Sequence, residues 1–264
     1  SCGSGPVVNT LGKAITLRAI GGPSVTVMDA LQSSHVILCD SSEGAYTIID
    51  GFTITGGNAT NGGGLNCNGS SPTIINCIFD SNSAEFGGGV HCEGSSPTIT
   101  NCTFTENAAS FSGGAIYSWL YSSPTITNCT FTANTATKYG GAVELTWFSD
   151  DVSIDDCTFT ANVENEVGGG VDIAGCTVDI TNSTFIGNVS NDRGSAIFHS
   201  GGYPEISTIS NCTISANSSL NNGGAVYLGT DITMDSCEIS SNQGGGVYIN
   251  NDTQNPDPPF LSNS

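Results

Sequence analysis

The chain has 264 residues, of which 24 are acidic and four are basic, and its formal net charge is −20. Phosphate groups and anionic lipids bind clustered cations, so this charge excludes nucleic acid and anionic membranes as expected partners. The hydrophobic share of 37% contains no run near the ~20 apolar residues that span a bilayer, so we expect no membrane insertion. No signal peptide is visible, and we expect the numbering to start after processing.

Residues 12–60 are predicted to form two irregular coils at the start of a single domain that covers residues 1–264. Short apolar runs at residues 14–17, 25–28 and 51–55 are separated by Gly, Pro and Ser, which is typical of short strands joined by turns. No segment shows helical periodicity.

From residue 61 to 243 one phrase recurs with small insertions. Two glycines, a small residue and an aliphatic residue are followed, about fifteen residues later, by Phe or Ile with Asn three positions on. Successive copies of this asparagine are 25 to 29 residues apart: Asn82, Asn107, Asn134, Asn162, Asn188, Asn217 and Asn242. A nearly constant period indicates stacked structural units with variable loops.

Each unit contains three short strands with turn residues between them, and one unit cannot bury its own apolar face. Stacked units pair strand upon strand in parallel at about 4.8 Å, which predicts a right-handed parallel β-helix with three short strands per coil. About nine or ten coils would make a rod of roughly 45 Å, with residues 244–264 as the last strand and tail.

The repeat assigns inward columns to the aliphatic residues, the phenylalanines and most of the cysteines. We expect the asparagine column to lie at a corner, where the side-chain amides bridge neighbouring coils. Inward cysteines behave as small apolar residues, so the predicted role of this column is packing, with disulfides between stacked neighbours left open.

The motif Gly113-Gly114-Ala115-Ile116 with Phe131 and Asn134 resembles the paired repeats of the polymorphic outer-membrane protein family. It is also similar to those of secreted bacterial right-handed β-helix proteins. The resemblance covers residues 12–250 and implies a secreted or surface-displayed protein. Members of this group include adhesins, and the wider fold includes pectate-lyase-like enzymes.

Two coils are lengthened at one corner, and both tryptophans of the chain lie in these insertions. Aromatic rings beside carboxylates suit sugar faces and hydroxyls, so we predict a glycan-binding or partner-binding patch here. Its candidate residues are His91, Tyr117, Trp119, Tyr121, Glu144, Trp147, Phe148, Asp172 and Phe198. Alternatively, these loops cover each other or form a subunit interface.

Glu144 and Asp172 occupy the same outward column on adjacent coils, the arrangement that a carbohydrate-active hydrolase would use. A lyase remains an alternative, but it needs an Arg or Lys base, and the basic residues lie at corners before the glycine phrase (Lys138, Arg193) or near the N-terminus (Lys13, Arg18). The chain requires no cofactor, although Asp150, Asp151 and Asp155 are a possible calcium site.

Three further expectations concern the surface. Threonine columns running through Thr103 and Thr105 are similar to ice-binding faces of other β-solenoids. Ends without caps predict end-to-end self-association into a fibre. Nine sequons are glycosylation candidates: Asn58, Asn68, Asn101, Asn128, Asn182, Asn188, Asn211, Asn217 and Asn251. The favoured function is structural or adhesive, with enzymatic and ice-binding alternatives.

Overall fold

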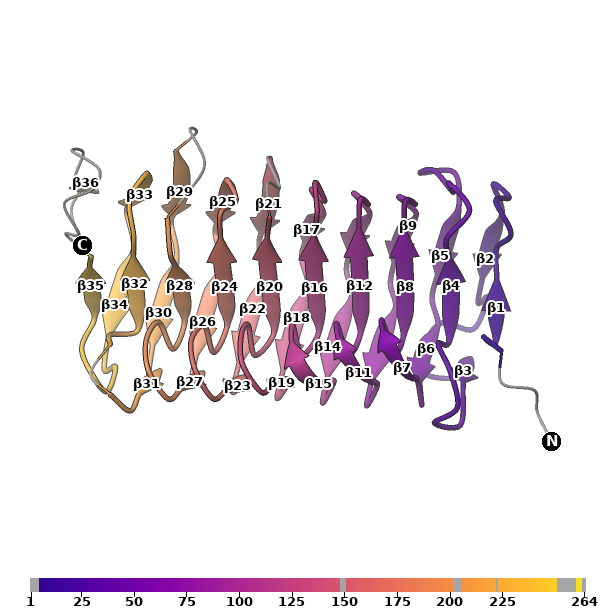
Figure 1. Ribbon diagram of the computed structural model, residues 1–264, viewed down its shortest axis with the longest axis horizontal. Coiled ribbons are helices and arrows are strands. Elements are labelled where there is room, and N and C mark those ends of the chain that lie inside the picture. Colours follow the sequence, from indigo (N-terminus) through magenta and orange to yellow (C-terminus); the bar gives the residue numbers. More distant parts are fainter. Residues whose placement is uncertain (1–4, 148–150, 202–205, 222, 251–259, 263–264) are drawn as a thin grey trace.

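The computed structural model describes residues 5–147, 151–201, 206–221, 223–250 and 260–262. They form a rod of stacked coils whose strands lie across the long axis (Figure 1). Strands β1 (Val8–Asn9) and β35 (Val247–Ile249) lie at opposite ends of the rod. All pairs between neighbouring coils are parallel, and the described residues contain no helix. The predicted parallel β-helix is confirmed.

Sheets A and B each contain ten strands, one from each successive coil. Sheet A consists of β1, β4 (Ile37–Cys39), β8 (Leu65–Asn68), β12 (Val90–Glu93), β16 (Ile116–Trp119), β20 (Val143–Thr146), β24 (Val171–Ala174), β28 (Ile197–His199), β32 (Val226–Leu228) and β35. Sheet B consists of β2 (Thr16–Arg18), β5 (Ile48–Asp50), β9 (Thr73–Ile75), β13 (Thr98–Thr100), β17 (Thr125–Thr127), β21 (Val152–Asp155), β25 (Val178–Thr181), β29 (Ser207–Ser210), β33 (Ile232–Asp235) and β36 (Phe260–Ser262).

Sheets C and D complete each coil. Sheet C consists of β3 (Val27–Asp29), β6 (Thr53–Thr55), β10 (Ile78–Asp80), β14 (Thr103–Thr105), β18 (Thr130–Thr132), β22 (Thr158–Thr160), β26 (Thr184–Ile186), β30 (Thr213–Ser215) and β34 (Glu238–Ser240). Sheet D consists of β7 (Asn58–Asn61), β11 (Ser83–Phe86), β15 (Ala108–Ser112), β19 (Thr135–Ala136), β23 (Val163–Glu164), β27 (Val189–Ser190) and β31 (Ser218–Ser219).

Sheet D corrects the prediction of three strands per coil, because the regular coils have four. Its strands are as short as two residues, as in Thr135–Ala136, and so show no alternation of apolar and polar residues in the sequence. Most contribute one small inward side chain, such as the buried Ala109 and Ala136, whereas β23 places Glu164 in this column.

The core consists of identical residues stacked in register. Phe79, Phe104, Phe131, Phe159 and Phe185 are fully buried, with ring centroids 4.6 to 4.9 Å apart and planes within 7° of parallel. The cysteines of the described residues are buried free thiols, and the column that begins at Cys77 donates weak Sγ hydrogen bonds to backbone carbonyls. The predicted packing role of this column is confirmed.

The asparagine column is a buried hydrogen-bonded ladder, as predicted. Nδ2 of Asn134 donates to the carbonyl oxygen of Phe104 at 3.0 Å and to Oδ1 of Asn162 at 3.0 Å. Oδ1 of Asn134 accepts from the backbone N–H of Asn107 at 3.0 Å. Each amide therefore satisfies backbone groups at a corner and links two coils.

The threonine columns lie in register on sheet C, where Thr103 pairs with Thr130 and Thr105 pairs with Thr132. Ile186 interrupts the second column, and its side chain is 40% exposed.

Candidate functional site

One outward column of sheet A contains two carboxyl side chains in the middle of the rod, with aromatic side chains on both sides of them. The column contains the second residue of successive strands, and each member pairs directly with the next. In coil order it reads Asn66, His91, Tyr117, Glu144, Asp172, Phe198, Tyr227 and Tyr248. The predicted carboxylates therefore lie side by side, between the aromatic residues Tyr117 and Phe198.

This part of the column is the floor of a groove with a volume of about 480 Å³. The side chains of Glu144 and Asp172 lie between those of Tyr117 and Phe198 along this floor. The remaining lining residues are Phe111, Ser112, Tyr139, Thr146, Trp147, Val167, Ala174, Asp192, Arg193 and Ser200.

The glycine phrase forms the bend that makes this face concave. Gly140 has a φ of +60°, which strains any residue with a Cβ. A Cβ on Gly141 would lie 2.3 Å from the carbonyl oxygen of Gly169, so the backbones of adjacent coils approach closely there. The residues just before the glycines, Tyr139 and Val167, stack by isolated parallel bridges and form one side of the groove.

The two carboxyl groups on the floor are held away from water. The exposed fraction is 6% for Glu144 and 2% for Asp172. Oε2 of Glu144 and Oδ1 of Asp172 have no hydrogen-bond partner among the described residues. Buried polar atoms normally have partners, so these two oxygens are left unsatisfied in the folded chain.

Both groups hold protons more tightly than carboxyls in water do. Burial raises the pKa of Glu144 to about 7, although the side chain of Ser112 acts to lower this pKa. Burial, with the charges of Glu144 and Glu164, raises the pKa of Asp172 well above its usual value. The cause is desolvation of the charged form, and at neutral pH the floor therefore carries at least one protonated carboxyl.

Glu164 adds a third carboxyl with a raised pKa close to Asp172. Its side chain is 1% exposed and points inward from sheet D, in the column that holds alanine in earlier coils. Burial raises its pKa to about 8. One oxygen accepts the backbone N–H of Glu166, and the other has no partner among the described residues.

Five of the predicted patch residues line the groove: Tyr117, Glu144, Trp147, Asp172 and Phe198. Trp119 packs edge-on against Trp147, with ring centroids 6.4 Å apart, but does not line the groove. Tyr121 is 67% exposed and also lies outside the lining.

His91 is buried and stacks on Tyr117, with ring centroids 5.5 Å apart. Burial lowers its pKa to about 4, so this imidazole is neutral near pH 7 and extends the aromatic packing beneath Tyr117. Phe148 lies outside the described residues.

One side of the groove was not predicted from the sequence. Phe111, Tyr139 and Arg193 line it, and each lies one or two positions before a glycine phrase. That common position is the signal that could have identified them, because the turn at the glycines directs the preceding residue toward the same face on every coil.

The predicted calcium site is only partly described. The carboxylate of Asp155 accepts hydrogen bonds from Thr181 at 2.6 Å and Asn182 at 2.7 Å, and Asp151 is exposed. Asp150 lies outside the described residues, and within those that are described no three His, Cys, Asp or Glu side chains form a group able to hold a metal ion.

The sequons differ in accessibility. Asn188 and Asn217 are fully buried members of the asparagine ladder, so the folded chain does not present them for glycosylation. Asn251 lies outside the described residues. The exposed candidates are Asn58, Asn68, Asn101, Asn128, Asn182 and Asn211.

Within the described part of the chain, no helix is long and apolar enough to cross a bilayer. No significant match was found among curated proteins or among solved structures. A family model described as a right-handed β-helix region matches residues 35–206 and 142–263, which together cover most of the chain. With its parallel sheets, stacked core and matching family model, the chain belongs to the right-handed β-helix family.

Proposed function

We propose that this protein is a secreted or surface-displayed rod that adheres to glycans through the groove on sheet A. The observation that carries the proposal is the combination, in one groove, of aromatic rings and buried carboxyl oxygens without partners. The rod supplies a rigid support, because the groove residues project from paired strands of the stack.

The chemistry of a sugar matches the chemistry of this groove. The apolar faces of sugar rings stack on aromatic side chains, and Phe198 and Trp147 are available for this contact. A protonated carboxyl both donates and accepts hydrogen bonds, so Glu144 and Asp172 suit hydroxyl groups, which do the same.

The direct test is a glycan array probed with the wild-type rod and with Trp147→Ala. The exposed fraction of Trp147 is 57%, so its removal should weaken glycan retention without disturbing the core. Tyr46→Ala is the matched control, because Tyr46 is 84% exposed and does not line the groove. Equal retention by all three proteins, or retention by none, would reject the proposal.

A second candidate function is glycoside hydrolysis, which the raised pKa values of Glu144 and Asp172 favour. A carboxyl that keeps its proton near neutral pH can protonate the departing glycosidic oxygen, while the second, ionised as a carboxylate, takes a proton from the water that attacks the sugar carbon. Release of reducing ends from polysaccharides by wild-type protein, and its loss in Glu144→Gln, would support hydrolysis. A rate that Glu144→Gln does not change would exclude this role for Glu144.

End-to-end association of rods and ice binding by the threonine columns remain predictions. Sedimentation at increasing concentration tests the first, and thermal hysteresis tests the second.

A further inference from the structure

A second cavity adjoins the groove toward the carboxyl-terminal end of the rod. Its volume is about 430 Å³, and its lining contains Tyr227, Tyr248 and the amide side chains of Asn221 and Asn250. Asp192 and Arg193 line this cavity and the groove alike. The two spaces therefore meet at these two residues.

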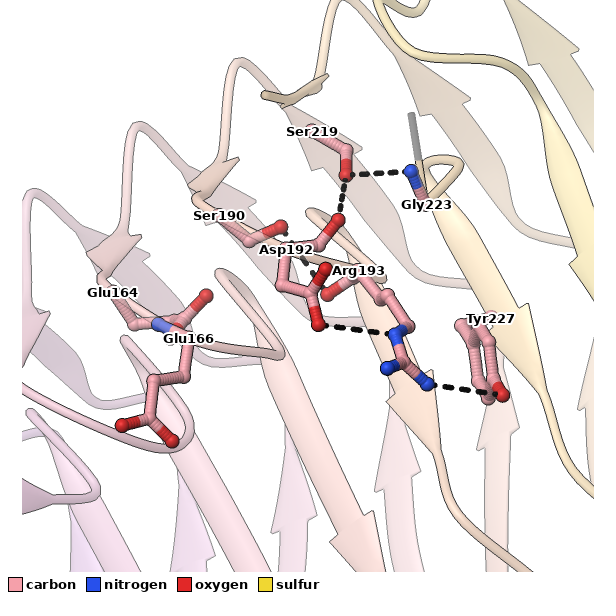
Figure 2. Close-up of polar contacts among 8 residues, drawn as sticks. All are labelled: Glu164, Glu166, Ser190, Asp192, Arg193, Ser219, Gly223 and Tyr227. Carbon is pink, nitrogen blue, oxygen red and sulfur yellow. Dashed lines mark hydrogen bonds and ion pairs between the residues drawn. The ribbon is translucent and has the colours of Figure 1, made fainter. Parts of the chain in front are cut away.

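Arg193 is held at this junction by contacts on both sides of its guanidinium group (Figure 2). Its Nε donates to Oδ2 of Asp192 at 3.0 Å, and its Nη1 donates to the hydroxyl of Tyr227 at 3.3 Å. The guanidinium carbon also lies 5.2 Å from the centroid of the Tyr227 ring. The pairing with Asp192 balances its charge, so Arg193 offers its remaining N–H groups as oriented donors in a locally neutral pair.

Aromatic rings continue from the groove floor into the second cavity. Phe198 stacks on Tyr227 with ring centroids 4.9 Å apart, and Tyr227 stacks on Tyr248 at 5.1 Å. Tyr248 is 49% exposed, whereas Tyr227 is 4% exposed, so Tyr248 presents the accessible ring of this cavity. The column from Tyr117 to Tyr248 crosses six coils, a length of about 24 Å along the rod axis.

The charges disfavour an anionic ligand. The chain has a net charge of −20, and the cation at the junction, Arg193, is already paired with Asp192. A uronate placed over the floor would be repelled by whichever of Glu144 and Asp172 is ionised, and among the described residues no ion pair neutralises either carboxyl. Hydroxyl groups carry no such penalty.

We propose that the ligand is an uncharged, extended oligosaccharide that lies along the rod axis over both cavities, with Arg193 donating hydrogen bonds to the sugar units on either side of it. This inference rests on the proposed glycan-binding function and adds the charge, the direction and the minimum extent of the ligand. Phe198 and Tyr248 are the two aromatic contact positions, one on each side of the junction.

The test is calorimetric titration of the whole chain with neutral disaccharides and hexasaccharides of β-linked glucose or mannose, and with galacturonate oligomers as the anionic comparison. A neutral hexasaccharide should bind about tenfold or more tighter than its disaccharide, since one more stacking contact is worth roughly that factor. Tyr248→Ala should remove this gain, so that hexasaccharide and disaccharide bind with similar affinity. Tyr46→Ala, far from both cavities, should change neither affinity.

The outcomes separate this inference from the function on which it rests. Tighter binding of galacturonate than of the neutral oligomers, equal affinity for the two lengths, or no effect of Tyr248→Ala would overturn the inference while glycan binding stands. Loss of the length dependence in Arg193→Gln would support the bridging role of Arg193, and an unchanged ratio of the two affinities in this variant would overturn that role. Absence of binding by every oligosaccharide would overturn the proposed function and this inference with it.

Discussion

The protonated carboxyl on the groove floor predicts that the rod loses stability as the pH rises from about 5 to 8. Glu144 has an ordinary pKa of 4.5, and burial raises it to about 7 in the folded chain. Below pH 4.5 the group is protonated in both the folded and the unfolded chain, so it does not change the free energy of unfolding. Between the two values the unfolded chain releases the proton and the folded chain keeps it, so stability falls until the folded pKa is passed.

The magnitude follows from the distance between the two pKa values. Each pH unit in this window is worth about 1.4 kcal/mol, so Glu144 alone should lower the free energy of unfolding by about 3 kcal/mol between pH 4.5 and 7. The other titratable and charged groups that line the groove are its column neighbours Tyr117 and Asp172, together with Tyr139, Asp192 and Arg193. Asp172 acts in the same direction, because its own pKa is raised by burial.

The assay compares two variants that remove the same charge at different depths. Glu144→Gln is neutral at every pH, so its stability relative to wild type should rise by about 3 kcal/mol between pH 5 and 8. Glu85→Gln is the control, because Glu85 is exposed on sheet D and measures only the general repulsion of an acidic chain. Urea unfolding followed by circular dichroism, in salt that screens surface charge, gives each value. Identical pH dependence in wild type and Glu144→Gln would refute the reasoning.

Three further variants test the stack itself by urea unfolding. Asn134→Ala removes hydrogen bonds that satisfy buried backbone groups, including the carbonyl of Phe104, and should cost about 3 kcal/mol; a change below about 1 kcal/mol would argue against a structural ladder. His199→Leu should stabilise the rod by about 1–2 kcal/mol, because the two buried ring nitrogens of His199 have no hydrogen-bond partner among the described residues; destabilisation would contradict this. Gly114→Ala should destabilise strongly or prevent folding, because the added Cβ would lie 2.1 Å from the carbonyl oxygen of Gly141, and a wild-type midpoint would disprove the close approach.

Most of the fold could be predicted because the same sequence pattern recurs on successive coils. The stacked phenylalanines and the asparagine ladder occupy identical positions on successive coils, so any one coil predicts the next. Sheet D escaped prediction because its strands are too short to show a period. Thr135–Ala136 is recognisable as a strand only through its parallel partners above and below.

The groove was only half predictable for a different reason. The outward column containing Glu144 and Asp172 follows directly from register. On the opposite side, the position of Tyr139 and Arg193 just before the glycine phrase marks them in the sequence, but that they line the groove depends on side-chain directions that spacing alone does not give. The tryptophans illustrate the same limit, because both lie in lengthened coils but only Trp147 lines the groove.

The energetic cost of the groove floor is itself an argument for function. Earlier coils place Asn66 and His91 at the same column position, where the two side chains contact each other at 3.2 Å. The stack therefore accepts at this position two polar side chains that contact each other, and the fold does not require carboxyls there. Glu144 and Asp172 instead leave buried oxygens without partners, each worth roughly 1–3 kcal/mol of lost stability. A feature that weakens the rod and lies on the floor of an aromatic groove supports the proposal that a ligand supplies the missing hydrogen bonds.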